Sequence, residues 1–309
     1  MRAKKILNNA FFEKKLYDII KNYDIIQTAE YDQLANIKLR KKLKDKLIIY
    51  HGPYASKYTK KYNIKCILSD FLIFFNKEYK NTVCLTKSNL ATQFLKNKGF
   101  TNVKTIGVGL DTDRFIKNGA NKESKPEYQG KNLLYIGKIE DRRNPLLLLE
   151  ILNKIEDNIK LIVIGNGNRK YLKKFEENIK KYNLEKRIIY KSKMEQRELR
   201  KIYENNNVFL FPSKYEIFGM VLLEAMYFNN IVISSVNGGS TTLIKDKING
   251  YIIDGFDVDK WVLKINEIIS DKNNKDVMVK ASNTIKQEYT WDKLVNKFIK
   301  GYKESIDDE

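Results

Sequence analysis

The second half of the chain alternates short apolar runs with longer amphipathic ones. "NLLYIG" at 132–137 and "VFLFPS" at 208–213 are apolar without a break, whereas "KYLKKFEENIKKYNL" at 170–184 repeats apolar residues every three or four positions. The first pattern is typical of buried strands and the second of amphipathic helices. The pattern predicts strands over 132–137, 159–165, 187–192, 208–213, 231–235 and 250–254, and helices over 145–155, 170–184, 195–206 and the segment around Glu224.

This alternation predicts an α/β fold with parallel sheets covered by helices, because strands that are apolar on both faces must be buried on both. The first half repeats the pattern less completely, with strand candidates at 23–29, 46–52, 82–88 and 103–109. A polar stretch with Gly and Pro at 116–132 separates the halves. We therefore expect two doubly wound parallel-sheet domains, 1–117 and 118–289, of which the first is incomplete.

The 309 residues include 42% apolar ones, which fits a folded protein, and carry a formal charge of +20. Such a field attracts nucleic acid or an anionic membrane surface. Lysines are spread along the chain, and no arginine-rich patch or stacking platform indicates a nucleic-acid binder. The densest basic run, Asn36 to Lys46, is either a solvated helix face or a contact for acidic lipid head groups.

The sequence contains no set of metal ligands that supports a metal site. Cys66 and Cys84 lie far apart and are expected to be core thiols, and His51 is the only histidine. "GNG" at 165–167, "DTD" at 111–113 and "DVD" at 257–259 are each interpreted as turns. Neither a membrane-spanning run nor a signal peptide is visible, so a cytoplasmic location is expected.

The stretch "FPSKYEIFGMVLLEAMYFNN" at 211–230 carries the strongest candidate chemistry. A strand runs into a loop containing Glu216, and the loop runs into a helix whose first amides, near Gly219, point out of the carboxyl edge of the sheet. Such a helix start binds phosphate, and glycine lets a ligand approach the backbone. Glu224 stands among apolar residues and needs a partner, which is either a ligand or a core Lys or Arg.

These residues resemble the family 4 retaining glycosyltransferases of the GT-B fold. The family motif PS-x-x-E-x-F-G-x-x-x-x-E-A is matched by Pro212, Ser213, Glu216, Phe218, Gly219, Glu224 and Ala225. The segments "LLYIGKIEDRRNPLLLLEIL", "NGGSTTLIKDKINGYIID" and "IGVGLDTDRF" are also similar to family segments. The resemblance implies two Rossmann-like domains that face a cleft, with the segment 290–309 returning as a helix to the N-terminal domain.

The resemblance also implies a role for each site residue. Glu224 would accept hydrogen bonds from a ribose, so that the ligand rather than the protein satisfies it, and Glu216 would lie beside the donor sugar. Lys138 and Arg143 would bind the donor diphosphate. The backbone of Phe218, Gly219, Met220 and Val221 would bind it as well. His51, at the end of the strand 46–52, would contact the sugar or a phosphate oxygen.

The implied reaction moves a sugar from a nucleoside diphosphate sugar, with UDP favoured, to a hydroxyl of a glycan or lipid-linked glycan. The setting would be the synthesis of cell-surface polysaccharide, with no cofactor and no bound metal. The resemblance implies that the first strands of the family are missing here, so a partner chain that supplies them, or a non-catalytic nucleotide-binding subunit, is an alternative. The charge and a lipid-linked acceptor would favour a peripheral contact with the inner face of an anionic membrane. No nucleic-acid partner is expected.

Overall fold

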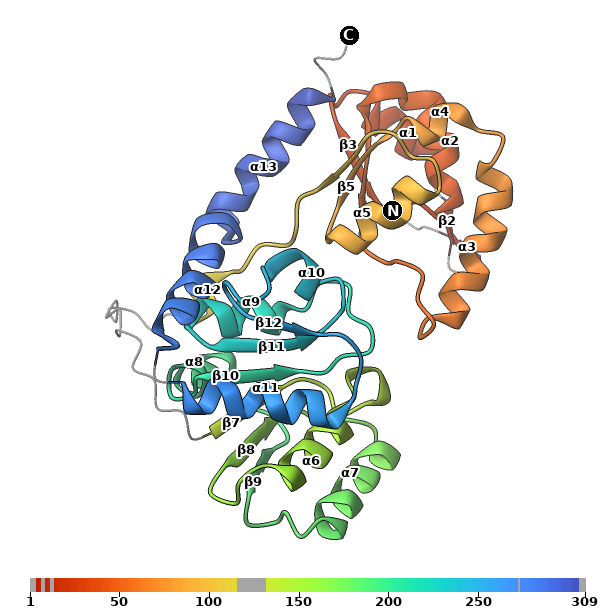
Figure 1. Ribbon diagram of the computed structural model, residues 1–309. Helices are drawn as coiled ribbons and strands as arrows, with labels where there is room; N and C mark the ends of the chain where they lie inside the picture. Colours follow the sequence, from red (N-terminus) through yellow and green to blue (C-terminus); the bar gives the residue numbers. More distant parts are fainter. Residues whose placement is uncertain (1–3, 7–8, 12–13, 116–131, 272, 306–309) are drawn as a thin grey trace. The chain divides into compact units, whose positions relative to one another are not determined.

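The structure is a computed structural model that describes residues 4–6, 9–11, 14–115, 132–271 and 273–305 (Figure 1). The chain divides into two compact units, each described here by itself. Unit 1 comprises Met1–Gly107 with Leu294–Glu309, and unit 2 comprises Val108–Lys293. The expected domain limits at 117 and 289 stay predictions, and the expected linker 116–132 lies almost entirely outside the described residues.

Unit 2 is built on a six-stranded parallel sheet, in the order β12-β11-β10-β7-β8-β9. All six predicted strands are confirmed. Their bounds are β7 Asn132–Ile136, β8 Lys160–Ile164, β9 Ile188–Lys191, β10 Val208–Phe211, β11 Ile231–Ser235 and β12 Tyr251–Ile253. Every side chain of β10 and β11 is buried, which is why β10 is a continuous apolar run in the sequence and β11 begins with one, Ile231–Ile233.

Helices cover the sheet of unit 2 (Figure 1). Leu148 of α6, Phe175 of α7 and Trp261 of α11 share one apolar core with the strands, and α9 packs against α12. The predicted helices are confirmed at α6 Pro145–Lys154, α7 Arg169–Lys181, α8 Gln196–Glu204 and α9 Met220–Tyr227. Further helices are α10 Ser240–Leu243, α11 Val258–Ser270 and α12 Lys275–Glu288.

Unit 1 contains a four-stranded parallel sheet in the order β3-β4-β5-β6, which confirms the four strands expected in the first half. A short antiparallel hairpin of β1 Lys4–Ile6 and β2 Asn9–Phe11 was not expected. The other bounds are α1 Lys14–Ile20, β3 Ile26–Ala29, α2 Leu34–Leu43, β4 Leu47–His51, α3 Lys60–Ile73, α4 Lys77–Lys80, β5 Val83–Thr86, α5 Asn89–Asn97 and β6 Val103–Thr105.

The last helix, α13 Trp291–Glu304, confirms the helix expected near the end of the chain. Its final turns pack on the sheet of unit 1. Tyr302 donates a hydrogen bond to Gln27 at 2.8 Å, and a Cβ added at Gly301 would lie 3.0 Å from Leu85. The glycine therefore lets the helix lie close to β5.

Two further expectations concern side chains of unit 1, namely its two cysteines and its basic run at 36–46. Cys66 and Cys84 are free and buried, as expected of core thiols. The basic run at 36–46 covers most of α2, whose Leu39 and Leu43 are buried while its lysines are exposed. This run has the character of a solvated helix face. None of the helices in the described residues is both long and apolar enough to cross a membrane.

Candidate functional site

The topology of unit 2 brings three loops to one edge of the sheet. β7 and β10 are neighbours, but the chain continues from β7 outward to β8 and β9, and from β10 outward to β11 and β12. The loops that follow β7 and β10 therefore diverge at this point, which in open α/β sheets is where ligands bind. The loop after β11 joins them, since Gly238 donates a backbone hydrogen bond to the Glu216 carbonyl at 3.0 Å.

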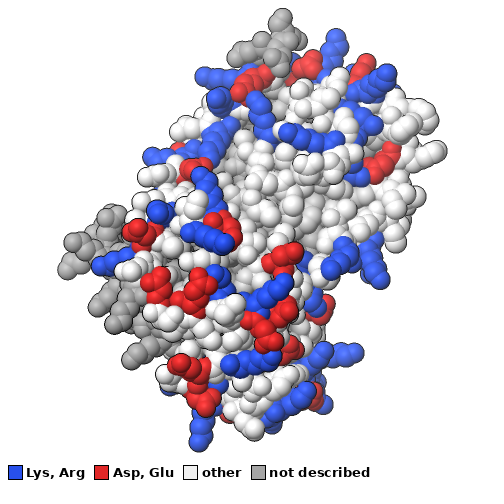
Figure 2. All heavy atoms as spheres, viewed as in Figure 1, with Lys and Arg blue, Asp and Glu red and all other residues white. Residues whose placement is uncertain are grey.

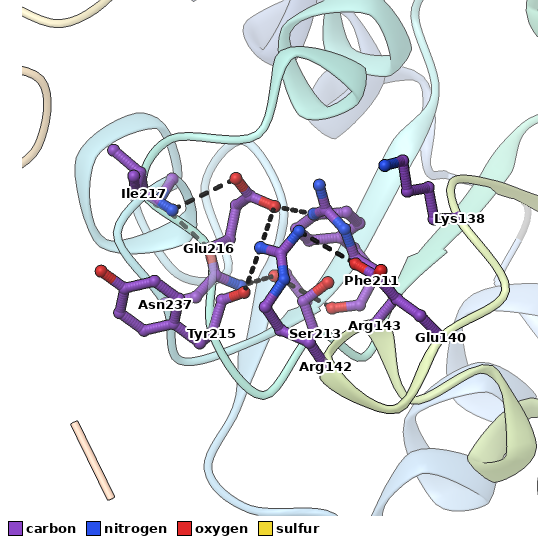
Figure 3. A network of polar contacts seen from close by, with 12 residues as sticks. Lys138, Glu140, Arg142, Arg143, Phe211, Ser213, Tyr215, Glu216, Ile217 and Asn237 are labelled. Atoms are coloured by element: carbon purple, nitrogen blue, oxygen red, sulfur yellow. Dashed lines mark hydrogen bonds and ion pairs between the residues drawn. The ribbon is translucent and has the colours of Figure 1, made fainter. Parts of the chain in front are cut away.

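An ion-pair cluster centred on the buried Glu216 occupies this edge (Figure 3). The Glu216 carboxylate, 10% exposed, pairs with the Arg143 guanidinium and lies 3.6 Å from a nitrogen of Arg142. Arg142 also contacts Glu140 at 3.0 Å and donates to the Tyr215 carbonyl at 3.1 Å. The two arginines come from the loop after β7 and Glu216 from the loop after β10. The cluster thus ties the two loops together across the switch point of the sheet.

Arg143 is the more enclosed of the two arginines. Its side chain is 17% exposed, and its guanidinium lies 5.6 Å from the centre of the Phe211 ring. Burial, with a smaller contribution from the charge of Arg142, lowers the pKa of Arg143 to about 10, so the group is still charged at neutral pH. Lys138 is exposed on the same loop beside the cluster, and Figure 3 draws no contact to it. The edge therefore carries three basic side chains against the carboxylates of Glu140 and Glu216, and this small net positive charge suits an anionic ligand.

The start of α9 lies beside this cluster. Gly219 precedes the helix with φ of +81°, and no side chain caps the amides of the first turn. A Cβ at Gly219 would lie 3.2 Å from Cγ of Glu216 and 3.3 Å from Phe211. Phe218 is buried, and Met220 is 39% exposed. Uncapped amides at a helix start next to two arginines form an anion-binding arrangement.

The glycine pair after β11, Gly238 and Gly239, packs against the loop that carries Glu216. A Cβ at Gly238 would lie 2.2 Å from the Ile217 carbonyl oxygen, and one at Gly239 only 1.7 Å from that of Phe218. Asn237 fixes this loop because its side-chain oxygen accepts from the amides of Gly239 and Ser240, both at 3.1 Å. The two glycines are thus required for the backbone to pack directly against the loop that carries Glu216.

We expect Gly239→Ala to lower the free energy of unfolding by about 3 kcal/mol, because backbone rather than a flexible side chain blocks the added carbon. The matched control is Gly255→Ala, where φ is +84° but no atom lies within 4 Å. It should cost only about 1 kcal/mol of backbone strain. Urea unfolding of both variants measures the difference. Equal losses would show that the close packing at Gly239 contributes little.

Glu224 lies on α9 with two protein partners. It accepts a hydrogen bond from the Tyr203 hydroxyl at 2.8 Å and one from Gln196 at 3.4 Å. The expectation that ligand rather than protein satisfies Glu224 is therefore wrong. The open alternative was a core lysine or arginine. Among the described residues the nearby basic group is Arg114, which is largely exposed and lowers the pKa of Glu224 through its charge. Burial raises the pKa of Glu224, and the bond from Tyr203 offsets part of this.

His51 ends β4 in unit 1 as expected, but its ring does not lie open at the strand end. The imidazole is fully buried and stacks on Phe94 with ring centres 5.9 Å apart. Its Nδ1 lies 2.7 Å from the carboxylate of Glu30, which also accepts the Gly52 amide and lies near Lys87. Burial raises the pKa of Glu30, but His51 and Gly52 outweigh it, so the pKa is lowered overall. A contact between His51 and a sugar stays a prediction.

The three short motifs interpreted as turns have structural partners. In the DTD motif, Asp111 pairs with Arg114 at 2.7 Å. Gly165 and Gly167 pack against the backbone of residues 137–139, where a Cβ would lie 1.8 and 2.1 Å from carbonyl oxygens. Asp257 caps α11 by accepting from the amides of Asp259 and Lys260. The GNG turn therefore supports the loop that carries Lys138.

The sequence did not predict three residues that contact the candidate site residues. Arg142 stands next to the predicted Arg143, and the doubled arginine was the available signal. Tyr203 and Glu30 had no local signal, because each meets its partner, Glu224 or His51, about twenty residues along the chain.

Fold and site together define a doubly wound α/β domain, with a helix start suited to an anion at a topological switch point. The family model of the Glycosyl transferases group 1 matches residues 117–285, and the chain belongs to this family. Its solved structural neighbours are GT-B glycosyltransferases, which confirms the expected fold class. The family assignment covers the segment in which all the unit 2 site residues lie.

Curated relatives and solved structures agree with this family and fold class. Over 177 residues the chain is 27% identical to an uncharacterized glycosyltransferase of Methanocaldococcus jannaschii, covering 56% of this chain and 45% of that protein. It is 29% identical over 178 residues to a lipopolysaccharide 1,2-N-acetylglucosaminetransferase of Salmonella typhimurium. That match covers 54% of this chain and 46% of the relative. Anabaena HepE in complex with UDP superposes with a TM-score of 0.77 at 15% identity. The superposition covers 93% of this chain and 80% of HepE. The chain spans less than half the length of these two curated relatives.

Proposed function

We propose that the protein is a retaining glycosyltransferase of family 4 that uses a nucleoside diphosphate sugar, with UDP as the nucleotide. Its acceptor would be a hydroxyl of a glycan or lipid-linked glycan in the synthesis of cell-surface polysaccharide. Support for the nucleotide comes from HepE, a fold neighbour whose structures include complexes with UDP and with UDP-glucose. Family membership favours this reading over a nucleic-acid binder.

In this proposal the diphosphate lies at the start of α9. The amides of Met220 and Val221 donate to its oxygens, and Lys138 and Arg143 neutralise its charge. The pairing of Arg143 with Glu216 keeps a buried guanidinium from being left without a counter-charge. When donor binds, the diphosphate takes over part of this pairing and Glu216 turns toward the sugar.

Glu224 would hold the ribose from the other side of the α9 start. Tyr203 and Gln196 fix its carboxylate by two hydrogen bonds, and the remaining acceptor capacity of its oxygens suits the two ribose hydroxyls. Glu224 is 6% exposed, so a ligand meets its carboxylate already positioned and largely desolvated.

The chemistry breaks the bond between the anomeric carbon and the diphosphate oxygen. The acceptor oxygen bonds to that carbon on the face that the diphosphate leaves, and its proton passes to a diphosphate oxygen. Negative charge grows on the diphosphate during this step, where the helix amides, Lys138 and Arg143 stabilise it. No metal or further cofactor is assigned a role in this proposal.

One observation carries the proposal: the Glu216–Arg143 cluster lies beside the uncapped start of α9, at the point where the loops after β7 and β10 diverge. A partner chain that adds strands to unit 1 stays part of the proposal. Among the described strands of that sheet, β3 pairs only with β4, so one of its edges is open to strand addition. Donor turnover by the purified chain alone would make such a partner unnecessary.

We expect calorimetric titration to show UDP binding with a micromolar Kd, and Arg143→Ala to raise that Kd at least about tenfold. GDP serves as the competing nucleotide. The matched control is Lys154→Ala, because Lys154 pairs with Asp259 at 2.6 Å on the surface of the same unit. That variant should bind UDP like the wild type. Failure of the wild-type chain to bind either nucleotide would contradict the proposed function.

A further inference from the structure

Helix α3 of unit 1 carries a continuous apolar face that is open to solvent. Its members recur every three or four positions and are followed by two phenylalanines just after the helix. The side chains are Ile64, Ile67, Leu68, Phe71, Leu72, Phe74 and Phe75, and they are between 54% and 81% exposed. We call these seven residues the α3 face. Soluble proteins rarely expose so many large apolar side chains together, and such patches mark interaction sites.

The α3 face is not the face by which the helix packs on its own unit. Cys66 and Ile73 point the other way into the core of unit 1, which also contains Ile49 and Cys84 of the sheet. Ser69 is buried on the same side. The helix therefore has one apolar side for the fold and a second that the fold of this unit does not use.

The charges around the α3 face are mainly positive. Residues 57–80 include six lysines and two acidic residues. Lys57, Lys60 and Lys61 are exposed before the face, and Lys77 is exposed after it. Asp70, the acidic residue within α3, is paired with Lys98 and accepts a hydrogen bond from Tyr31. Both ends of the α3 face thus carry basic side chains that suit an anionic surface.

Figures 1 and 2 agree with an exposed, apolar α3 face. Figure 1 places α3 at the outer side of unit 1, and Figure 2 shows that part of the surface as largely uncharged. The basic run at 36–46 differs, because Leu39 and Leu43 of α2 are buried and the run exposes no large apolar side chain. Charge and exposed apolar surface therefore occur together on α3 and not on the more basic α2.

We propose that the α3 face docks into the head-group layer of an anionic lipid bilayer, with the helix in the plane of the membrane. Fourteen residues give a helix about 21 Å long, which suits an interfacial rather than a spanning segment. A second copy of the chain fits less well, because lysines at both ends of the face would meet one another. This docking does not depend on the proposed transfer reaction.

The test is flotation of the full chain with vesicles of phosphatidylcholine containing about one quarter phosphatidylglycerol. We expect the wild type to float with these vesicles, and Phe71→Ser with Phe75→Ser to lower the partition coefficient at least about tenfold. About 0.5 M salt should weaken the wild-type binding, since it screens the lysines. Both phenylalanines are exposed, so the double variant should unfold at the wild-type temperature.

The matched control removes exposed apolar side chains elsewhere, with Leu263→Ser and Val279→Ser in unit 2. This variant should float like the wild type. Wild-type binding that the phenylalanine variant leaves unchanged would overturn the proposal, as would equal binding to vesicles of phosphatidylcholine alone. A wild-type dimer that does not float and that the phenylalanine variant converts to monomer would assign the face to a second copy instead.

Discussion

Glu216→Gln is expected to lower the rate of sugar transfer at least about a hundredfold while changing the Kd for UDP less than about threefold. Glutamine keeps the size of the side chain and one oxygen acceptor but removes the charge that faces Arg143. The proposed position of Glu216 is beside the sugar, whose anomeric carbon gains positive charge as the diphosphate leaves. UDP lacks that sugar, so its affinity reports the rest of the site. Release of UDP from donor and acceptor measures the rate, and calorimetry measures the affinity.

The control for this variant is Glu140→Gln in the same cluster. Glu140 contacts Arg142 at 3.0 Å and is 29% exposed, so it resembles Glu216 in its arginine pairing but not in its burial. Its replacement should change the transfer rate less than about threefold. If Glu216→Gln transfers sugar at the wild-type rate, or loses UDP affinity as strongly as rate, Glu216 does not lie beside the sugar.

Glu224→Gln is expected to raise the Kd for UDP at least about tenfold and at the same time to stabilise the fold at pH 7. The carboxylate would accept the ribose hydroxyls as a charged acceptor, and an amide oxygen is weaker. Stability changes in the opposite direction because burial disfavours the ionised form of Glu224. The amide can still accept the hydrogen bond from Tyr203. Titration with UDP and urea unfolding measure the two effects.

The pH dependence follows from the raised pKa of Glu224. Between its ordinary value and the raised one, the unfolded chain has lost the proton while the folded chain keeps it. Stability from this group therefore falls as pH rises through that interval, and the loss is complete above the raised pKa. The advantage of Glu224→Gln should be present at pH 7 and disappear below about pH 4. A variant less stable than the wild type at pH 7 would show that the carboxylate is net stabilising.

Tyr203→Phe is the companion variant. Tyr203 is fully buried and stacks on Phe228 with ring centres 5.6 Å apart, so phenylalanine keeps the packing and removes only the hydroxyl. Glu224 then loses its shortest hydrogen bond, and both stability and UDP affinity should fall. Because this variant keeps the charge of Glu224 and removes only a hydrogen bond to it, it distinguishes the effect of positioning the carboxylate from the effect of its charge.

The order of strands and helices was determined by the sequence because it depends on local burial. β10 is buried on both faces and apolar throughout, and β11 begins with the apolar run Ile231–Ile233, so each is recognisable within a few residues. The start of α9 was predictable for the same reason, since Gly219 and the apolar run after it are adjacent in the chain. The β1–β2 hairpin had no such signal, because its strands have only three residues each.

The partners of the charged groups were decided by the tertiary structure. Arg143 meets Glu216 because β7 and β10 are neighbours in the sheet, and Tyr203 meets Glu224 because α8 and α9 flank β10. Periodicity reports only that a residue is buried, whereas its partner depends on the order in which distant strands pair. The α3 face shows the same limit: α3 is apolar on two sides, and only packing against the sheet of unit 1 shows which side stays exposed.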